Sequence, residues 1–435
     1  MLAVASVAAA CTDAKVEPTA GVERIGNVTT TSPPPLPPTG KLNGLHGTAP
    51  AADPPADFAA RLKKIDPSVT ANVDDAARPY DITIIAALAA EQARTDSPGR
   101  IANQIIDITT KAKRCSTYKL CRERTDAGAP LRYEGATGPI DMLPNGEPAD
   151  ATFGVYKFDA SDRLVQTGVK SNELSEQAKK AVIPNEPDPN AGPKADGVFK
   201  VGMVFPTEGD LARVAAAQRA GVRLAIDEIN AEGGVVGVPA QLLDGDSGKG
   251  DSAATAALQL VQQGADVIIG GSASSDTDAM LGPVTDARVI LFAPSATAAS
   301  LVTAEDHGLF FRLAPSDVLQ GGVLASVVAD DGLVNVTVIA ENSTYGKGLA
   351  LSFGGGFTPL GGNVLNTISF EPGEPAPDVV ARALAAPADG YVILADATAT
   401  GAVLDEFVGR GKSPSQIPMY VANISTSLAA AVRNG

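Results

Sequence analysis

The sequence predicts an α/β protein with two lobes, each built on a parallel β-sheet covered by helices. From residue 197 onward, short apolar runs alternate with amphipathic segments, the pattern of parallel strands buried on both faces. This alternation contains more strands than one compact sheet holds, so two lobes are expected. The chain has 435 residues, 44% of them hydrophobic and 19% charged, which suits a globular protein of two or three domains.

The elements of residues 197–435 follow a regular order. The run VFKVGMVFP predicts a strand, and the next segment predicts a helix with Val222, Ile226 and Ile229 on one face. Further strands are expected at 239–246, 265–271, 288–294, 335–342, 361–370, 389–396 and 416–423. Helices are expected at 252–264, 277–287, 318–332, 346–357, 378–386, 399–411 and 429–435.

Residues 44–171 form a separate block between two proline-rich breaks. The first break, 12–43, contains TTTSPPPLPPTG and predicts an extended tether, and the second, 172–196, predicts a linker. Inside the block, helices are expected at about 80–94 and 98–112. Two strands joined by a turn, ATFGVYKFD and the segment after it, end the block.

The first eleven residues, MLAVASVAAAC, resemble the later part of a bacterial lipoprotein signal, with Cys11 as the lipid-bearing residue. The apolar run is too short to span a bilayer. Two features depart from such signals, because no Lys or Arg precedes the run and Ala8 stands where leucine is usual. The alternative is an alanine-rich cytosolic N-terminus; export is the favoured interpretation.

The two remaining cysteines, Cys115 and Cys121, lie close together in KRCSTYKLCRER. In an exported protein this predicts a local disulfide, whereas in a cytosolic protein two unpaired thiols are expected. The spacing is not that of a C-x-x-C redox or zinc motif. Since His46 and His307 are the only histidines, no zinc site is expected.

Charge and motifs exclude several classes of protein. The 34 basic and 50 acidic residues give a net charge of −16, which argues against a nucleic-acid binder. The stretch GDSGKG contains Ser247 in a protease-like setting, but no histidine is near it in the sequence, and the stretch is not a phosphate-binding P-loop. No catalytic residue, cofactor or metal site is predicted.

Hydroxyl-rich loops follow two neighbouring predicted strands. SASSDT, with Ser272, Ser274 and Ser275, follows ADVIIGG, and SAT, with Ser295 and Thr297, follows RVILFAP. Ligands of open parallel sheets bind outside the carboxyl ends of strands, where hydroxyls and backbone N–H groups suit an anion. The alternative is ordinary helix capping, which also favours Ser and Thr.

The second block, residues 197–435, is similar in sequence to a known family. FKVGMVFPTEGD, AGVRLAIDEINAEGG, ADVIIGGSASSDT, ILFAPSAT, LFFRLAPSDVLQG and VTVIAENSTYGKGLA resemble, in order and spacing, the branched-chain amino-acid (Leu/Ile/Val)-binding proteins. These are type I periplasmic solute-binding proteins of ABC importers. The resemblance implies the two-lobed type I periplasmic-binding-protein fold with three crossovers, with 197–316 as lobe 1 and 317–435 as lobe 2, closing on a ligand.

The first block resembles the last third of the same family, in GLHGTAP, RPYDITIIAALAAEQA and GATGPIDMLPNGEPADATFGVYKF. The family's final third thus comes first, which predicts a circular permutation with the cut at AAAVRNG. Residues 44–171 are then expected mostly in lobe 1, with their last strands in lobe 2. The alternative is that two chains exchange these blocks in a dimer.

The resemblance also implies roles for single residues. Ser274 matches the serine that holds the ligand carboxylate, and Ser295 matches a residue whose carbonyl receives the ammonium. Thr297 matches the threonine that binds both groups, and Tyr345 matches the tyrosine that closes over the ligand from lobe 2.

Two positions depart from the family pattern. Asp396 stands near the place of an aromatic residue, and Asn423 replaces the glutamate that relatives direct at the ammonium. An ammonium held away from water needs a negative partner. Asp396 is one candidate for that partner; otherwise the ligand is an amide or carboxylate rather than an α-amino acid.

The resemblance implies an extracytoplasmic solute-binding lipoprotein on the outer face of the cytoplasmic membrane. It would work as a monomer with ABC permease subunits, bind a small polar ligand, and need no cofactor. An envelope ligand sensor with the same lobes is the alternative, and a hydrolase using Ser247 is a third hypothesis.

Overall fold

The structure is a computed structural model that describes residues 40–435 with gaps. The gaps are 52–53, 70–72, 111–112, 174–181, 183, 210, 249–252, 386–387, 425–427, 429–431 and 433–435. The expected signal with Cys11 and most of the expected tether therefore lie outside the described residues. So does the helix expected at 429–435, apart from Val432.

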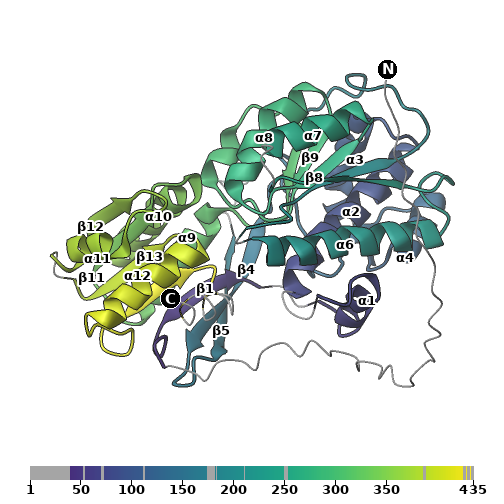
Figure 1. The fold of residues 1–435 in the computed structure, drawn as a ribbon. Coiled ribbons are helices and arrows are strands. Elements are labelled where there is room, and N and C mark those ends of the chain that lie inside the picture. Colours follow the sequence, from purple (N-terminus) through teal and green to yellow (C-terminus); the bar gives the residue numbers. More distant parts are fainter. Residues whose placement is uncertain are drawn as a thin grey trace, which may run out of the picture. The chain divides into compact units, whose positions relative to one another are not determined.

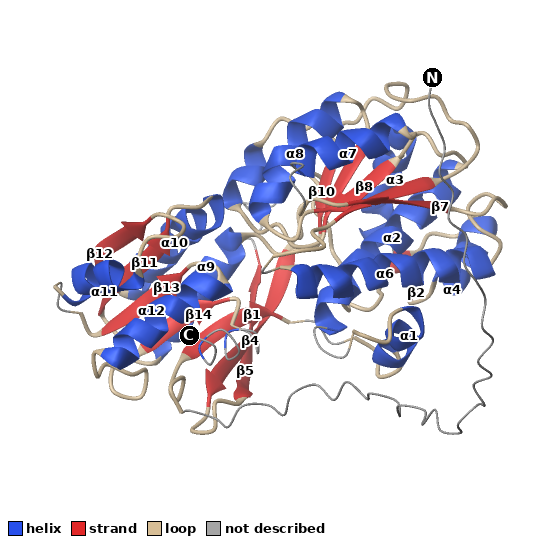
Figure 2. Ribbon diagram, in the orientation of Figure 1, coloured by secondary structure: helices blue, strands red, loops and turns tan. Residues whose placement is uncertain are grey.

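Seven strands form one sheet, in the order β12-β11-β13-β14-β1-β4-β5 (Figures 1 and 2). Their bounds are Asn363–Phe370 (β12), Asn335–Glu341 (β11), Gly390–Leu394 (β13), Met419–Ala422 (β14), His46–Pro50 (β1), Asp150–Phe158 (β4) and Leu164–Glu173 (β5). The first five are parallel, and β4 and β5 are antiparallel to their neighbours. The helices of this part are α9 (Asp317–Asp330), α10 (Thr344–Phe357), α11 (Ala376–Leu384) and α12 (Ala397–Gly409).

Five parallel strands form the second sheet, in the order β10-β9-β8-β6-β7. Their bounds are Phe310–Arg312 (β10), Ile290–Ala293 (β9), Val267–Gly270 (β8), Lys200–Val204 (β6) and Gln241–Gly245 (β7). The helices of this part are α1 (Phe58–Ile65), α2 (Val73–Ala93), α3 (Pro98–Thr110), α4 (Tyr118–Asp126), α6 (Ala212–Ala231), α7 (Ala253–Gln262) and α8 (Ser274–Asp286).

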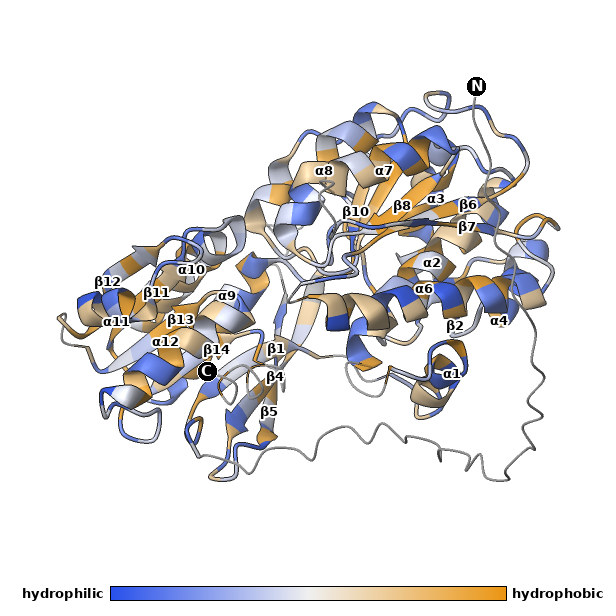
Figure 3. Ribbon diagram, in the orientation of Figure 1, coloured by the Kyte–Doolittle hydropathy of each residue, from blue (hydrophilic) through white to orange (hydrophobic). Residues whose placement is uncertain are grey.

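The apolar runs of the sequence form the interior of both sheets. Every residue of β8, β9 and β13 is buried, because helices cover both faces of these strands. Figure 3 shows hydrophobic residues concentrated on the central strands, with hydrophilic residues on the outer helix faces. The predicted α/β fold with parallel-sheet lobes is confirmed.

The first block contributes to both sheets. Helices α1 to α4 belong with the five-stranded sheet, and β4 and β5 lie in the seven-stranded sheet. Strand β1 also lies in the seven-stranded sheet. It pairs in parallel with β14, with His46 opposite Tyr420 and Thr48 opposite Ala422, because β14 has an unpaired edge that this strand completes.

Helix α2 is longer than expected. It begins at Val73 rather than near residue 80 and continues through Pro79, whose carbonyl accepts a hydrogen bond from the Thr83 hydroxyl at 2.7 Å. Helix α2 packs closely against α6, so tertiary contact overrides the helix-breaking tendency of proline. At Gly221 of α6 an added Cβ would lie 2.2 Å from the Ala76 carbonyl oxygen.

Replacing Gly221 by alanine is expected to lower the free energy of unfolding by about 1–3 kcal/mol, because the methyl group forces α2 and α6 apart. The measurement is urea unfolding of the full chain. The control is Gly355→Ala in α10, where nothing lies within 4 Å of the added Cβ and stability is expected to rise by up to about 1 kcal/mol. Equal effects of the two substitutions would contradict the close packing of α2 on α6.

The ends of the expected tether and linker pack onto the fold rather than standing free. The backbone N–H groups of Gly40 and Leu42 donate to the Asp162 carboxylate at 2.7 and 3.0 Å. In the expected linker, the Asn185 N–H donates to the Pro144 carbonyl at 2.8 Å, and its side chain donates to the Asn145 carbonyl at 3.1 Å. Backbone groups at these positions are satisfied by the folded part, which sequence composition alone does not reveal.

A disulfide joins Cys115 and Cys121. Cys115 ends the short strand β2 (Arg114–Cys115), which pairs with β3 (Arg132–Tyr133), and Cys121 lies in α4. Both cysteines are buried. The bridge therefore ties the start of α4 to the small two-stranded sheet.

Candidate functional site

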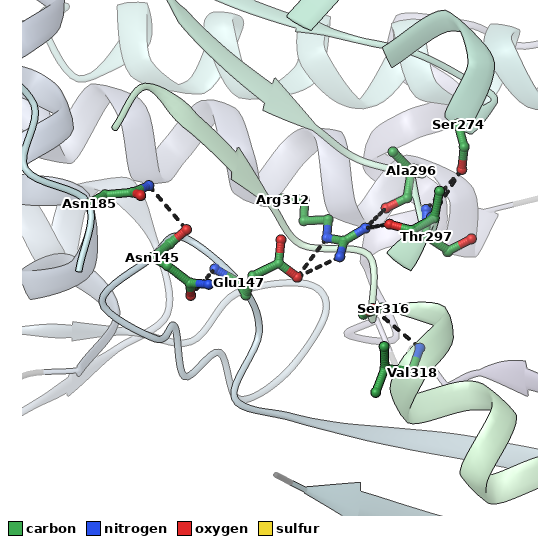
Figure 4. A network of polar contacts seen from close by, with 10 residues as sticks. Asn145, Glu147, Asn185, Ser274, Ala296, Thr297, Arg312, Ser316 and Val318 are labelled. Atoms are coloured by element: carbon green, nitrogen blue, oxygen red, sulfur yellow. Dashed lines mark hydrogen bonds and ion pairs between the residues drawn. The ribbon is translucent and has the colours of Figure 1, made fainter. Parts of the chain in front are cut away.

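The two hydroxyl-rich loops meet at the carboxyl ends of β8 and β9. Ser274 is the first residue of α8, and its Oγ accepts hydrogen bonds from the backbone N–H groups of Thr297 and Ala298, both at 3.2 Å (Figure 4). Ser274 and Thr297 are each only 7% exposed. The structure thus brings these two predicted residues together.

A buried glutamine connects the remaining serines of these loops. Gln218 of α6 donates from Nε2 to Ser295 Oγ at 2.6 Å, and its Oε1 accepts from the Ser272 hydroxyl at 2.6 Å. Sequence reasoning missed Gln218. The available signal was a polar residue directly after the apolar run VAAA.

A buried ion pair holds the loop that carries Thr297. Arg312 of β10 donates from Nε and Nη2 to Glu147 Oε2 at 2.9 and 2.6 Å. Its Nη1 donates to the carbonyls of Ala296 and Ala298 at 3.1 and 2.9 Å (Figure 4). Arg312 has no solvent exposure, and Glu147 comes from the first block. The guanidinium therefore fixes the backbone on both sides of Thr297.

Tyr345 and Asn423 lie together beside the seven-stranded sheet. Asn423 follows β14 with a φ of 50°, and its Nδ2 donates to the Tyr345 hydroxyl at 3.0 Å. Its Oδ1 accepts from Gln320 Nε2 of α9 at 3.0 Å. Burial raises the pKa of Tyr345, and the nearby Asp317 carboxylate adds to the shift. Gln320 was also missed by sequence reasoning.

Asp396 has a clear local role. It is the N-cap of α12, and its Oδ1 accepts from the Ala399 N–H at 2.7 Å. Its side chain is exposed, and its charge contributes to a raised pKa of Glu341, which burial chiefly causes. Capping accounts for the aspartate without any ligand.

Asp317 contacts the Thr297 loop and lies near Tyr345. Its N–H donates to the Thr297 carbonyl at 2.7 Å, and its carboxylate lies near enough to Tyr345 to raise that pKa. It has no solvent exposure. Burial raises the pKa of Asp317 itself to about 7, and the Thr297 side chain and Arg312 charge offset this only in part.

Other candidate chemistry is not assembled in the described part of the chain. His46 pairs with Asp331 at 2.8 Å and His307 with Asp286 at 3.0 Å, and neither contacts Ser247. A hollow of about 470 Å³ lies beside His46, Asp331 and Tyr420, and no predicted site residue lines it. Among the described residues, no cluster of His, Cys, Asp or Glu suits a metal ion, and none of the helices has the length and apolarity needed to cross a membrane.

Comparisons with known proteins point to one family. The model of a family described as periplasmic binding protein matches residues 198–433. The leucine-, isoleucine-, valine-, threonine- and alanine-binding protein of Pseudomonas aeruginosa is 30% identical over 158 residues, 36% of this chain and 42% of that protein. The Leu/Ile/Val-binding protein of Escherichia coli is 28% identical over 169 residues, 38% of this chain and 46% of that protein.

Solved structures give similar matches. The substrate-binding protein LivJ of Streptococcus pneumoniae, in complex with isoleucine, is 26% identical with a TM-score of 0.48, covering 54% of this chain and 67% of that chain. A leucine-, isoleucine-, valine-, threonine- and alanine-binding protein of Brucella ovis is 20% identical with a TM-score of 0.46, covering 52% and 60%. The match spans less than half the length of each of these two curated relatives.

Proposed function

This chain belongs to the periplasmic binding proteins, whose family model covers more than half of it, and we propose that it is an extracytoplasmic solute-binding protein of an ABC importer. It binds a small polar ligand between the Ser274–Thr297 loops and the Tyr345–Asn423 pair. The names of its relatives make amino acids the first ligands to test.

The observation that carries this proposal is the construction of the Thr297 loop. Ser274 and the buried Arg312–Glu147 pair hold that loop at the strand ends. Asp317 joins the loop to Tyr345 but is fully buried, so a ligand reaches it only when the two parts separate. Opening and closing of the lobes therefore forms part of the proposal.

The finer organisation is proposed as well. Lipid attachment at Cys11, a monomeric state, ABC permease partners and a place on the outer face of the cytoplasmic membrane follow from the family resemblance. We propose that the chain is circularly permuted relative to its family. This is supported by the pairing of β1 with β14 and by one hydrophobic cluster that contains Leu42, Leu45, Leu428 and Val432.

A thermal-shift screen of amino acids, amides and small carboxylates tests the binding function. A ligand at 100 times its Kd is expected to stabilise the folded state by about 2.7 kcal/mol and to raise Tm measurably. The variant Ser274→Ala should weaken that ligand about tenfold or more, because two buried N–H groups lose their acceptor. The control Ser326→Ala removes a hydroxyl that bonds only within α9 and should leave Kd unchanged. No shift with any compound would contradict the proposal.

A further inference from the structure

The first turn of α9 carries three buried acceptor atoms that receive no hydrogen bond of normal geometry from the described residues, although the Thr297 side chain lies near enough to Asp317 to lower its pKa. Among the described residues, no donor makes a hydrogen bond of normal geometry to Asp317 Oδ1, Asp317 Oδ2 or Gln320 Oε1. Both side chains have no solvent exposure. They are three residues apart on one helix, so they share a face. Buried polar atoms are nearly always paired, so three unpaired acceptor atoms on one face require an explanation.

All the unpaired atoms are of one kind. A carboxylate and an amide oxygen can only accept, and two of the three atoms carry negative charge when Asp317 is ionised. The amide nitrogen of Gln320 is already used, because it donates to Asn423 Oδ1 at 3.0 Å. The missing partner is therefore a group with several hydrogen-bond donors, and a positive charge on it, as on an ammonium, would offset the buried negative charge.

The protein does not supply that group from its own surroundings. The cation near Asp317 is Arg312, and its guanidinium is fully engaged by Glu147 and by the carbonyls of Ala296 and Ala298. The other titratable groups facing this place are Tyr345 of α10, and Glu341 and Asp396 at the ends of β11 and β13, whose charges raise the pKa of Tyr345. These neighbours are neutral or acidic.

The opposite side of the site has the complementary polarity. Ser274 Oγ already accepts two N–H groups, and no described residue accepts its hydroxyl proton, so this hydroxyl is free to donate. A ligand that joins an acceptor end to a cationic donor end matches both sides.

We propose that Asp317 and Gln320 are ligand-binding residues that receive a cationic, N–H-donating group of the ligand, such as a primary ammonium. This rests on the proposed binding function and identifies the negative partner that Asn423 does not supply. The first turn of α9, rather than the end of β14, then selects for the cationic group. Amide or carboxylate ligands without such a group bind poorly.

The proposal has a consequence for pH. Burial raises the pKa of Asp317 to about 7, above the ordinary value for a carboxyl group, so below about pH 7 the folded protein without ligand favours the protonated form. Its contribution to stability is full below the ordinary carboxyl pKa and is lost as the pH rises to about 7. A cationic ligand needs the ionised form, so affinity should rise as the pH increases from 5 to 8.

The test compares wild type, Asp317→Asn and the control Asp396→Asn, which keeps a residue suited to capping α12. Two matched sets of probes are used: amine-bearing compounds, including L-leucine, and their deaminated counterparts, including 4-methylpentanoate. For wild type, amine-bearing probes should bind at least tenfold more tightly. Asp317→Asn should remove that preference and the pH dependence of Kd, whereas Asp396→Asn should keep both.

A second readout needs no ligand. At pH 8 the Tm of Asp317→Asn should equal or exceed that of wild type, because the amide removes a buried unpaired charge. A lower Tm would show that Asp317 has a structural partner and would overturn the inference. If the affinity of the probes depends neither on their amine group nor on the Asp317→Asn substitution, the inference is overturned while the proposed binding function stands. If no probe binds wild type, the proposed function fails and the inference fails with it.

Discussion

Replacing Glu147 by glutamine is expected to lower the free energy of unfolding by about 3–5 kcal/mol and to abolish ligand binding. The substitution keeps the shape of the side chain but leaves the fully buried Arg312 without its counter-charge. The same guanidinium holds the carbonyls on both sides of Thr297, so movement of Arg312 would displace that loop as well. Urea unfolding measures the first effect, and thermal shift with the ligand from the screen measures the second.

The control for this experiment is Glu406→Gln. Glu406 pairs with Arg410 within α12 at 2.6 Å, but both side chains are partly exposed. Exposed pairs of this kind contribute about 0–1 kcal/mol, so this variant should unfold almost as wild type does. If the free energy of unfolding of Glu147→Gln also falls within about 1 kcal/mol of wild type, the carbonyls alone suffice as partners for Arg312. The ion pair would then not stabilise the site.

Residues 184–435 alone are expected to lose cooperative unfolding. Without the first block, β14 has no β1 beside it, α6 has no α2 against it, and Arg312 has no Glu147. Exposed apolar surface on α6 and an open sheet edge favour aggregation over a folded state. Circular dichroism during heating, together with binding of a hydrophobic dye, measures this loss.

A chain with its two blocks in the opposite order tests whether block order matters when the contacts between the blocks are kept. Placing residues 184–435 first and residues 40–183 after them restores the proposed family order, and we expect cooperative unfolding and ligand binding close to those of the full chain. Gel filtration of the natural chain adds a further check, because block exchange between two chains would give a dimer. Cooperative folding of residues 184–435 alone would contradict the essential role of the first block.

Much of the fold follows from patterns that are local in the sequence. Apolar runs of strand length, such as VIIG and ILFA, predicted buried parallel strands, and the structure has β8 and β9 there. The meeting of Ser274 and Thr297 was also predictable, since neighbouring parallel strands end at the same edge of a sheet. Helix α2 began earlier than expected because its packing on α6 is not visible in its own sequence.

The supports of the candidate site were not predictable in the same way. Glu147 and Arg312 lie 165 residues apart, and neither local sequence predicts that the two residues pair. Gln218 and Gln320 look like ordinary helix residues until their neighbours are known. Asp396 was a candidate for an anionic partner from its place after a strand, yet its Oδ1 caps α12.

The sequence by itself determined the α/β class, the order of strands and helices, and the loops at which binding groups gather. These depend on periodicity and on chain neighbours, which the sequence contains directly. Only the tertiary structure decided that β1 completes the edge of β14, that Arg312 is neutralised by Glu147, and that the buried Asp317 carboxylate receives no hydrogen bond of normal geometry from the described residues. Burial and pairing depend on which distant segments surround a side chain, and that information exists only once the chain is folded.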